Sequence, residues 1–286
     1  MKKTKKNSQW REVWRRFRKS KTAMFGLFLL IIVVGMAIFA DVIVPYEKAT
    51  EQNIMVRKQG PSAEHWFGTD ELGRDVFARV VHGSRYSLLI GISTSVFSLI
   101  LGGLLGAIAA FYGGTVDNII MRITDIVMTV PPILLSLAVV AALGPNLKNL
   151  LLAITISCVP SMVRMVRSVV LTVADQDYIE AARSYGASDM RIILKYVIPN
   201  ALGLIIVTTT MNVAGMILSA AGLSFIGMGV QPPAPEWGAL LSDAETYMFD
   251  APHLLYFPGL FIVISALSFN LVGDGLRDAL DPKLKN

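Results

Sequence analysis

Six long stretches without Asp, Glu, Lys or Arg are the strongest constraint on how this chain folds. Five of them reach or nearly reach the roughly 20 apolar residues that a helix needs to cross a bilayer. The fourth is shorter, and we expect it to continue to about Val173, with Arg164 and Arg167 reaching toward the membrane surface. The stretches are 22–40, 86–116, 126–147, 149–163, 196–235 and 251–273. Charged residues make up 16% of the chain, against about 25% in soluble domains, so the pattern predicts an all-α integral membrane protein.

The fifth stretch is long enough for two spans, but its second half, "AAGLSFIGMGVQPPAP", is rich in Gly and Pro. These helix breakers suit a loop or a re-entrant segment, so we predict six transmembrane helices. The expected order is a basic cytoplasmic segment (1–21), a first transmembrane helix (22–44), an external loop with an amphipathic helix (45–84), a domain of five transmembrane helices (85–275) containing a cytoplasmic loop (174–199), and a cytoplasmic tail (276–286).

The distribution of Lys and Arg predicts the orientation. Residues 1–21 hold ten Lys and Arg and one Glu, which places the N-terminus in the cytoplasm. We interpret this basic segment as a membrane anchor and not as a nucleic-acid site. Six spans return the C-terminus to the cytoplasm. The predicted external segment 230–250 has four acids and no Lys or Arg, which agrees with this topology.

The external loop should contain a turn at Gly68 followed by an amphipathic helix capped by Thr69 or Asp70. Gly102, Gly103 and Gly106 lie in the next span, where small residues permit close approach of a second helix.

Prolines mark two of the later spans. Pro131 and Pro132 lie in the middle of the third span and Pro160 in the fourth. Proline removes a backbone donor and kinks a helix, so each position is a candidate hinge or a packing kink. Arg122 and Asp125 are spaced to pair along one helix.

Residues 174–199, "ADQDYIEAARSYGASDMRIILKYVIP", interrupt the apolar pattern with charges. Asp175 or Asp177 is expected to cap a first short helix, and Gly186 suits the left-handed position that ends it. A second helix should end at Pro199, which then begins the fifth span. The segment is either a mechanical coupler or an ordinary structured loop.

This segment closely resembles the EAA loop of ABC importer permeases. The matching residues are Glu180, Ala181, Ala182, Gly186, Ile198 and Pro199, with Ile-Pro in place of the commoner Leu-Pro. The resemblance implies that the short helix seats in a cleft of a cytoplasmic ATPase. The implied ATPase-coupling residues are Tyr178, Glu180, Ala181, Ala182, Arg183, Tyr185, Gly186, Ala187 and Pro199.

Four further stretches resemble the C-type permease of dipeptide and oligopeptide importers, and the likeness extends over nearly the whole chain. They are "HWFGTDELGRDVFARVVHGSRYSLLIG", "GGTVDNIIMRITDI", "LSFIGMGVQPPAPEWGALLSD" and "FNLVGDGLRDALDPKLK". The resemblance implies a type I importer fold in a bacterial cytoplasmic (inner) membrane. It also implies as partners a homologous second permease, two ATPases that bind ATP and Mg, an extracytoplasmic substrate-binding protein, a peptide cargo and membrane lipid.

No catalytic or metal-binding pattern accompanies this segment. There is no P-loop and no H-E-x-x-H, and the histidines His65, His82 and His253 are scattered, so we expect neither an enzyme nor a bound cofactor or metal. In the fifth span, Thr208, Thr209, Thr210 and Asn212 either line a pathway or bond between helices. The cargo could also be a nickel complex, glutathione or another peptide-like solute. The alternative from another functional class is a channel or secondary transporter that works without an ATPase.

Overall fold

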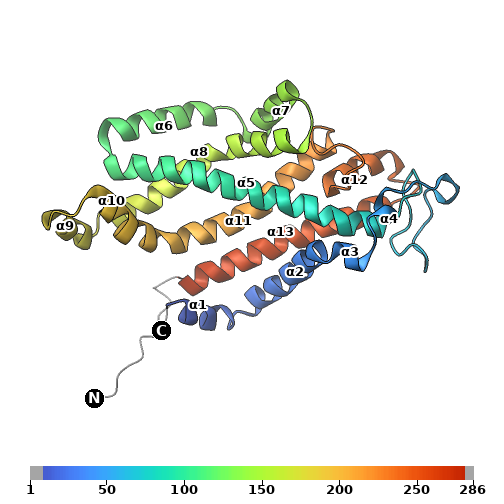
Figure 1. The fold of residues 1–286 in the computed structure, drawn as a ribbon, viewed down its shortest axis with the longest axis horizontal. Coiled ribbons are helices and arrows are strands. Elements are labelled where there is room, and N and C mark those ends of the chain that lie inside the picture. The colour runs from blue at the N-terminus through green and yellow to red at the C-terminus, as the bar shows by residue number, and fades with distance from the viewer. Residues whose placement is uncertain (1–8, 281–286) are drawn as a thin grey trace, which may run out of the picture.

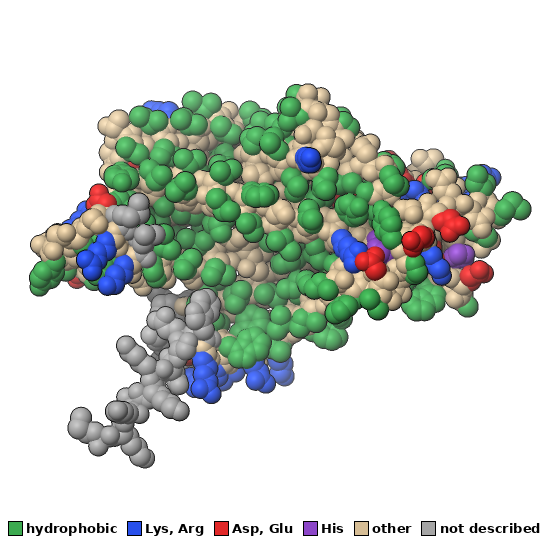
Figure 2. Space-filling view, viewed as in Figure 1, with side chains coloured by type: hydrophobic (Ala, Val, Ile, Leu, Met, Phe, Trp, Pro, Cys, Tyr) green, Lys and Arg blue, Asp and Glu red, His purple; other side chains and the backbone are tan. Residues whose placement is uncertain are grey.

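The computed structural model describes residues 9–280, and all regular structure in that range is helical apart from one isolated bridge between Thr69 and Asp75. The molecule is elongated, with most long helices running along its long axis (Figure 1). We call its two ends after the short helices that lie there: the α9 end (α9, Asp177–Ser184) and the α4 end (α4, Glu47–Thr50). On the face drawn in Figure 2, apolar side chains cover the body and most charges gather near the ends.

Helices α1 (Gln9–Phe17) and α2 (Lys21–Ile38) form the N-terminal part and pack on α13 (His253–Leu280). The side chain of Ser20 caps α2 by accepting from the Ala23 amide. A Cβ on Gly26 would lie 2.5 Å from the Cβ of Leu271, so glycine is what lets α2 and α13 approach closely. Residues 1–8 of the predicted basic segment lie outside the described residues.

Helix α5 (Val76–Tyr112) is one continuous helix of 37 residues, which corrects two expectations. There is no separate amphipathic helix in the described loop before it, where the chain forms only the short elements α3 (Ala40–Ile43), α4 and a 3-10 turn (Ile54–Val56). The cap is also Asp75, which accepts from the Ala78 amide at 2.8 Å, not Thr69 or Asp70. Because no proline stands between Asp75 and Gly113, the helix that begins there extends directly into the span.

Helices α5 and α8 (Leu147–Ala174) make the most extensive helix contact, and the predicted small residues are at its centre. A Cβ on Gly106 would lie 2.4 Å from the Val163 carbonyl oxygen, and one on Gly102 would lie 2.9 Å from that of Val159. The prediction of close approach is therefore confirmed at Gly102 and Gly106, whereas a Cβ on Gly103 would make only ordinary van der Waals contacts.

The predicted third span is broken into α6 (Gly114–Met128) and α7 (Pro132–Leu143), which meet at 81°. Pro131 has extended backbone and Pro132 is in the first turn of α7, so the paired prolines separate two helices and do not merely bend one. Within the described residues, five helices are long and apolar enough to cross a membrane, or six spans if the bent pair counts as one.

The C-terminal half consists of α8, α9, α10 (Asp189–Ile192), α11 (Ile198–Phe225), α12 (Trp237–Ala244), a 3-10 turn (Glu245–Tyr247) and α13. The loop between α11 and α12 agrees with the predicted breaker-rich segment. Helix α13 continues to Leu280, past the predicted end of the transmembrane domain at residue 275, so the first residues of the predicted tail, 276–280, are helical. Residues 281–286 lie outside the described residues.

Candidate functional site

The short helix α9 stands at one end of the molecule and is closed by glycine as predicted (Figure 1). Gly186 has φ +77°, the left-handed conformation that side chains disfavour. The Gly186 amide donates to the Arg183 carbonyl, and the Ala187 amide donates to the Ala182 carbonyl. These two hydrogen bonds form the Schellman motif that is typical of glycine-terminated helices.

The start of α9 differs from the expectation. Gln176 is the N-cap and makes no side-chain capping bond. Asp175 instead ends α8, because its amide still bonds to the Leu171 carbonyl, and Asp177 lies inside the first turn of α9. The carboxylate of Asp177 therefore acts on the helix dipole and not as a cap.

Helix α9 is anchored to the body by its inner face. Ile179 is buried in a cluster with Phe111, Val170 and Ile192, and the Arg183 guanidinium lies 5.3 Å from the centre of the Phe111 ring. Ala182 packs against the same cluster. Of the two alanines among the implied coupling residues, only Ala181 is exposed.

The outer face of α9 projects away from the rest of the chain. Tyr185 is 92% exposed and Tyr178 is 42% exposed, with Glu180 and Arg183 also exposed. Two tyrosine rings beside a small residue and a carboxylate form a compact protrusion, whose opposite face packs on the body of the molecule. Such a face suits insertion into a partner, since aromatic side chains are enriched where interfaces gain most of their energy.

The helix after Gly186 does not end at Pro199. Instead, α10 continues through a π turn (Ile193–Val197) into α11, so the chain is helical without a break from Asp189 to Phe225. Pro199 has no amide hydrogen to reach the carbonyl four residues earlier, and the wider turn, in which the Ile198 amide bonds to Ile193, accommodates this loss.

The predicted pathway residues have local partners. Thr208, Thr209 and Thr210 each donate to the carbonyl four residues earlier in α11, at 2.9, 2.7 and 2.8 Å. The Thr209 carbonyl also accepts from Ser95 of α5. Asn212 is partly buried one turn further on. Their role in a pathway stays a prediction.

Helices α6 and α8 are joined by two ion pairs that sequence spacing could not reveal. Arg167 donates through two nitrogens to both carboxylate oxygens of Asp117, and Arg164 donates to Asp125 at 2.7 Å. The expected partner of Asp125 was Arg122, but Asp125 contacts the other helix instead. Pro160 lies buried inside α8, which continues past it without a break.

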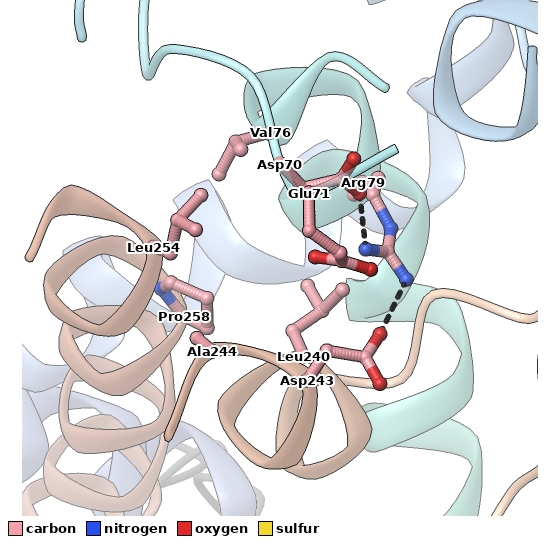
Figure 3. A pocket seen from close by; sticks show the side chains of 9 residues that line it. All are labelled: Asp70, Glu71, Val76, Arg79, Leu240, Asp243, Ala244, Leu254 and Pro258. Atoms are coloured by element: carbon pink, nitrogen blue, oxygen red, sulfur yellow. Dashed lines mark hydrogen bonds and ion pairs between the residues drawn. The ribbon is translucent and has the colours of Figure 1, made fainter. Parts of the chain in front are cut away.

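At the α4 end, a buried charge network fastens the loop before α5 to α12 (Figure 3). Arg79 donates to Asp70 and to Asp243, and Arg74 pairs with Asp70 at 2.7 Å. Burial raises the pKa of the neighbouring Glu71 carboxyl, and the charges of Asp70 and Asp243 raise it further. The sequence shows these charges but not that the fold brings them together.

Glu236, which sequence reasoning missed, is a fully buried carboxyl at the start of α12. It accepts from the Ala239 amide and from the Ser87 hydroxyl of α5, both at 3.0 Å. Burial nonetheless raises the pKa of the Glu236 carboxyl. A raised pKa in the folded state means that the stabilisation is complete below the ordinary carboxyl pKa of about 4.3 and is lost as the pH rises through the folded-state value.

We therefore expect Glu236→Gln to stabilise the protein more at pH 8 than at pH 5, because the neutral amide avoids the buried charge. The difference between the two proteins should change by at most about 1.4 kcal/mol per pH unit, the slope for one proton. Thermal unfolding in detergent at several pH values measures it. A difference that stays constant between pH 5 and pH 8 would contradict the expectation.

Comparison with known proteins shows which family this chain is similar to. Residues 102–286 match the family described as binding-protein-dependent transport system inner membrane component, and residues 8–61 match the N-terminal TM domain of oligopeptide transport permease C. The chain is 47% identical over 279 residues to the dipeptide transport system permease protein DppC of Alkalihalophilus pseudofirmus, covering 98% of this chain and 91% of that protein. It is 45% identical over 280 residues to the glutathione transport system permease protein GsiD of Escherichia coli, covering 96% and 91%.

Among solved structures, an inward-facing form of the MetNI methionine ABC transporter matches with a TM-score of 0.60 at 20% identity. The match covers 71% of this chain and 96% of that one. At this identity the likeness concerns the fold, which is that of a type I permease. Among residues 9–280, no group of three or more His, Cys, Asp or Glu side chains is arranged to hold a metal ion.

Proposed function

We propose that this chain carries di- or oligopeptides into the cell by ATP-driven alternating access. The proposal follows from its family, since the chain belongs to the binding-protein-dependent transport system inner membrane components and is an ABC importer permease of the dipeptide and glutathione type. The proposed location is the bacterial cytoplasmic membrane with both termini in the cytoplasm, so that the α9 end faces the cytosol. The predominance of Lys and Arg in residues 1–21 supports this orientation.

In this proposal, α9 couples the permease to partner ATPases that bind ATP and Mg, while this chain binds neither. The observation that carries the proposal is the contrast between the two faces of α9: Ile179 is buried, whereas Tyr185 is almost fully exposed. Because the inner face of α9 packs on the permease and the outer face is exposed, a partner that binds the outer face can transmit its movement to the permease. The remaining partners are a homologous second permease, which makes the membrane unit a heterodimer, and an extracytoplasmic substrate-binding protein.

Alternating access needs elements that change their relative position. The break at Pro131 and Pro132 lets α6 and α7 move separately, while α8 stays continuous through Pro160. We propose the paired prolines as the hinge.

Peptides are the favoured cargo because the dipeptide permease is similar over nearly its whole length. Glutathione, itself a modified tripeptide, is the second candidate, supported by the comparably similar glutathione permease.

Reconstitution tests the function. The chain is co-expressed with the second permease, the ATPases and the binding protein of the same organism, and the purified complex is placed in proteoliposomes. We expect uptake of a labelled dipeptide that requires ATP and the binding protein, and competition by excess glutathione distinguishes the second cargo. Equal uptake without ATP, or driven by an ion gradient alone, would overturn the proposal.

A further inference from the structure

Helix α6 presents three different faces. One face packs on the body through Asp117, Ile120, Met121 and Thr124. A second face is exposed and apolar, with Val116, Ile119, Ile123 and Ile126. The third is exposed and polar, with Thr115, Asn118, Arg122 and Asp125. At 100° per residue these sets fall about 120° apart, so the polar face is distinct from the apolar face that suits lipid.

Helix α8 carries a matching polar strip on the half nearest the α9 end. Its exposed residues there recur every three or four positions and are all polar: Ser161, Arg164, Ser168 and Thr172. Toward the other end of α8, the exposed residues Leu152 and Ile156 are apolar. Apart from Lys148 in the first turn, the exposed polar side chains of α8 thus lie in the half nearest the α9 end of a helix that is long enough to span a membrane.

The two polar surfaces meet where Arg164 contacts Asp125. This pair, which we call the open pair, has a single bond of 2.7 Å, and its side chains are 50% and 52% exposed. The neighbouring pair Arg167–Asp117 is bonded through two nitrogens and is only 27% and 18% exposed. The second pair therefore serves to hold α6 on α8, whereas the open pair leaves donor and acceptor positions free.

A half-exposed ion pair in this place does not suit hydrocarbon. Arg164 lies about 15 Å from the end of α8 and turns to the neighbouring helix. Charged side chains within membrane-spanning segments face water-filled cavities or protein partners, because lipid tails offer them no hydrogen bonds. The surrounding hydroxyls and Asn118 extend the wettable surface along both helices.

We propose that this polar strip of α6 and α8 lines the water-filled part of the pathway and that the open pair binds the charged termini of the peptide cargo. The inference rests on the proposed function, since it takes a free peptide as the solute. At neutral pH such a peptide carries an α-ammonium and an α-carboxylate. Arg164 receives the carboxylate, for which a guanidinium offers a two-pronged donor, and Asp125 receives the ammonium.

The exchange conserves charge. One ion pair within the protein opens and two pairs with the peptide close, so neither Arg164 nor Asp125 is left unpaired in a poorly solvated place. When the peptide leaves, the open pair forms again. A site built in this way holds any peptide by its ends and is indifferent to the side chains, which suits a carrier of varied peptides.

The test compares three solutes in proteoliposomes that contain the complete transporter: a free dipeptide, its N-acetyl form and its C-terminal amide. Arg164→Gln should reduce uptake of the free dipeptide about tenfold, the value of one charge-assisted bond, and leave uptake of the amide unchanged. Asp125→Asn should act in the same way on peptides with a free amino group and spare the N-acetyl form. Equal losses for all three solutes would assign the pair a purely structural role and overturn the inference.

Labelling provides a second readout that does not depend on delivery by the binding protein. In a Cys158→Ser background, which removes the only native cysteine, Ser168→Cys on the polar strip should react with a charged thiosulfonate at least tenfold faster than Ile123→Cys on the apolar face of α6. Free dipeptide should slow the reaction at Ser168→Cys, and N-acetyl dipeptide amide should not. Equal rates at the two positions would overturn the inference.

A lipid headgroup shares part of this chemistry. Uptake effects that vanish in phosphatidylcholine vesicles and return with phosphatidylglycerol would assign the pair to anionic lipid and overturn the inference. Wild-type complex that takes up none of the solutes would contradict the proposed cargo itself, whereas normal uptake by both variants would contradict only the role of the open pair.

Discussion

Tyr185→Ala is expected to detach the ATPase subunits from the complex while leaving the stability of this chain unchanged. The ring is 92% exposed, so its removal costs the chain no internal packing. If the ring seats in a partner, its truncation should cost at least about 2 kcal/mol of binding, the size of an interface hot spot, or roughly thirtyfold in affinity. Co-purification of the ATPases at graded salt, together with thermal unfolding of the isolated permease pair, measures both quantities.

Two variants on the same helix serve as controls. Ile179→Ala removes the buried anchor, so it should lower the stability of the α9 end as well as ATPase binding. Ser184→Ala removes an exposed hydroxyl that bonds only to the Glu180 carbonyl of its own helix, so it should change neither. Full ATPase binding by Tyr185→Ala would contradict the coupling role of α9.

Trp237→Ala is expected to lower the free energy of unfolding by about 3–5 kcal/mol. The side chain is fully buried where α12 packs against α5, and its Nε1 donates to the Val80 carbonyl at 2.9 Å. A Cβ on Gly83 would lie 2.9 Å from the indole, so α5 is shaped to receive this ring. Truncation leaves a cavity and removes the hydrogen bond that the indole donates to the Val80 carbonyl.

The matched control is Trp66→Ala, which removes a tryptophan that is 64% exposed and contacts Phe77. This variant should change the free energy of unfolding by about 0.5 kcal/mol or less. Thermal and denaturant unfolding in the same detergent compares the two variants. Similar losses of unfolding free energy for Trp66→Ala and Trp237→Ala would show that burial of the tryptophan does not determine how much its removal destabilises the protein.

The parts of the fold that could be predicted from sequence are those that local chemistry determines. The run from Leu147 to about Val173 was predicted as a helix because its apolar content is sustained, and the structure ends it at Ala174. Gly186 was predicted to end α9 because glycine alone tolerates the left-handed conformation without strain. Gly106 was predicted to mark a close helix contact, although its partner on α8 could not be named.

The errors arose where a local signal had two outcomes. Pro131 and Pro132 can kink a helix or end it, and only packing decides that α6 and α7 diverge by 81°. Pro199 lies in the first turn of α11 as predicted, but a π turn absorbs its missing donor, so the preceding helix does not end there. Thr69 and Asp70 have good capping chemistry, yet Asp75 caps α5 because Asp70 is engaged by Arg74 and Arg79.

Pairs between distant segments were beyond the reach of sequence reasoning. Arg122 and Asp125 have the spacing of a helical ion pair, but a guanidinium from α8 is the partner that Asp125 contacts. Glu236 gave no signal at all, since a single acid in a proline-rich loop is ordinarily solvated. The open pair and the buried carboxyl of Glu236 therefore became apparent only from the three-dimensional structure.

The unbroken helix from Asp189 to Phe225 has a mechanical consequence. It runs about 55 Å, from beside α9 to the loop that carries Glu236, and stays helical through the π turn and Pro199. If the helix moves as one body, a tilt imposed at the end beside α9 reappears, in the opposite sense about any fixed point along its length, at the end beside Leu223. Under the proposed function, this one helix would link movements of α9 to the opposite side of the membrane.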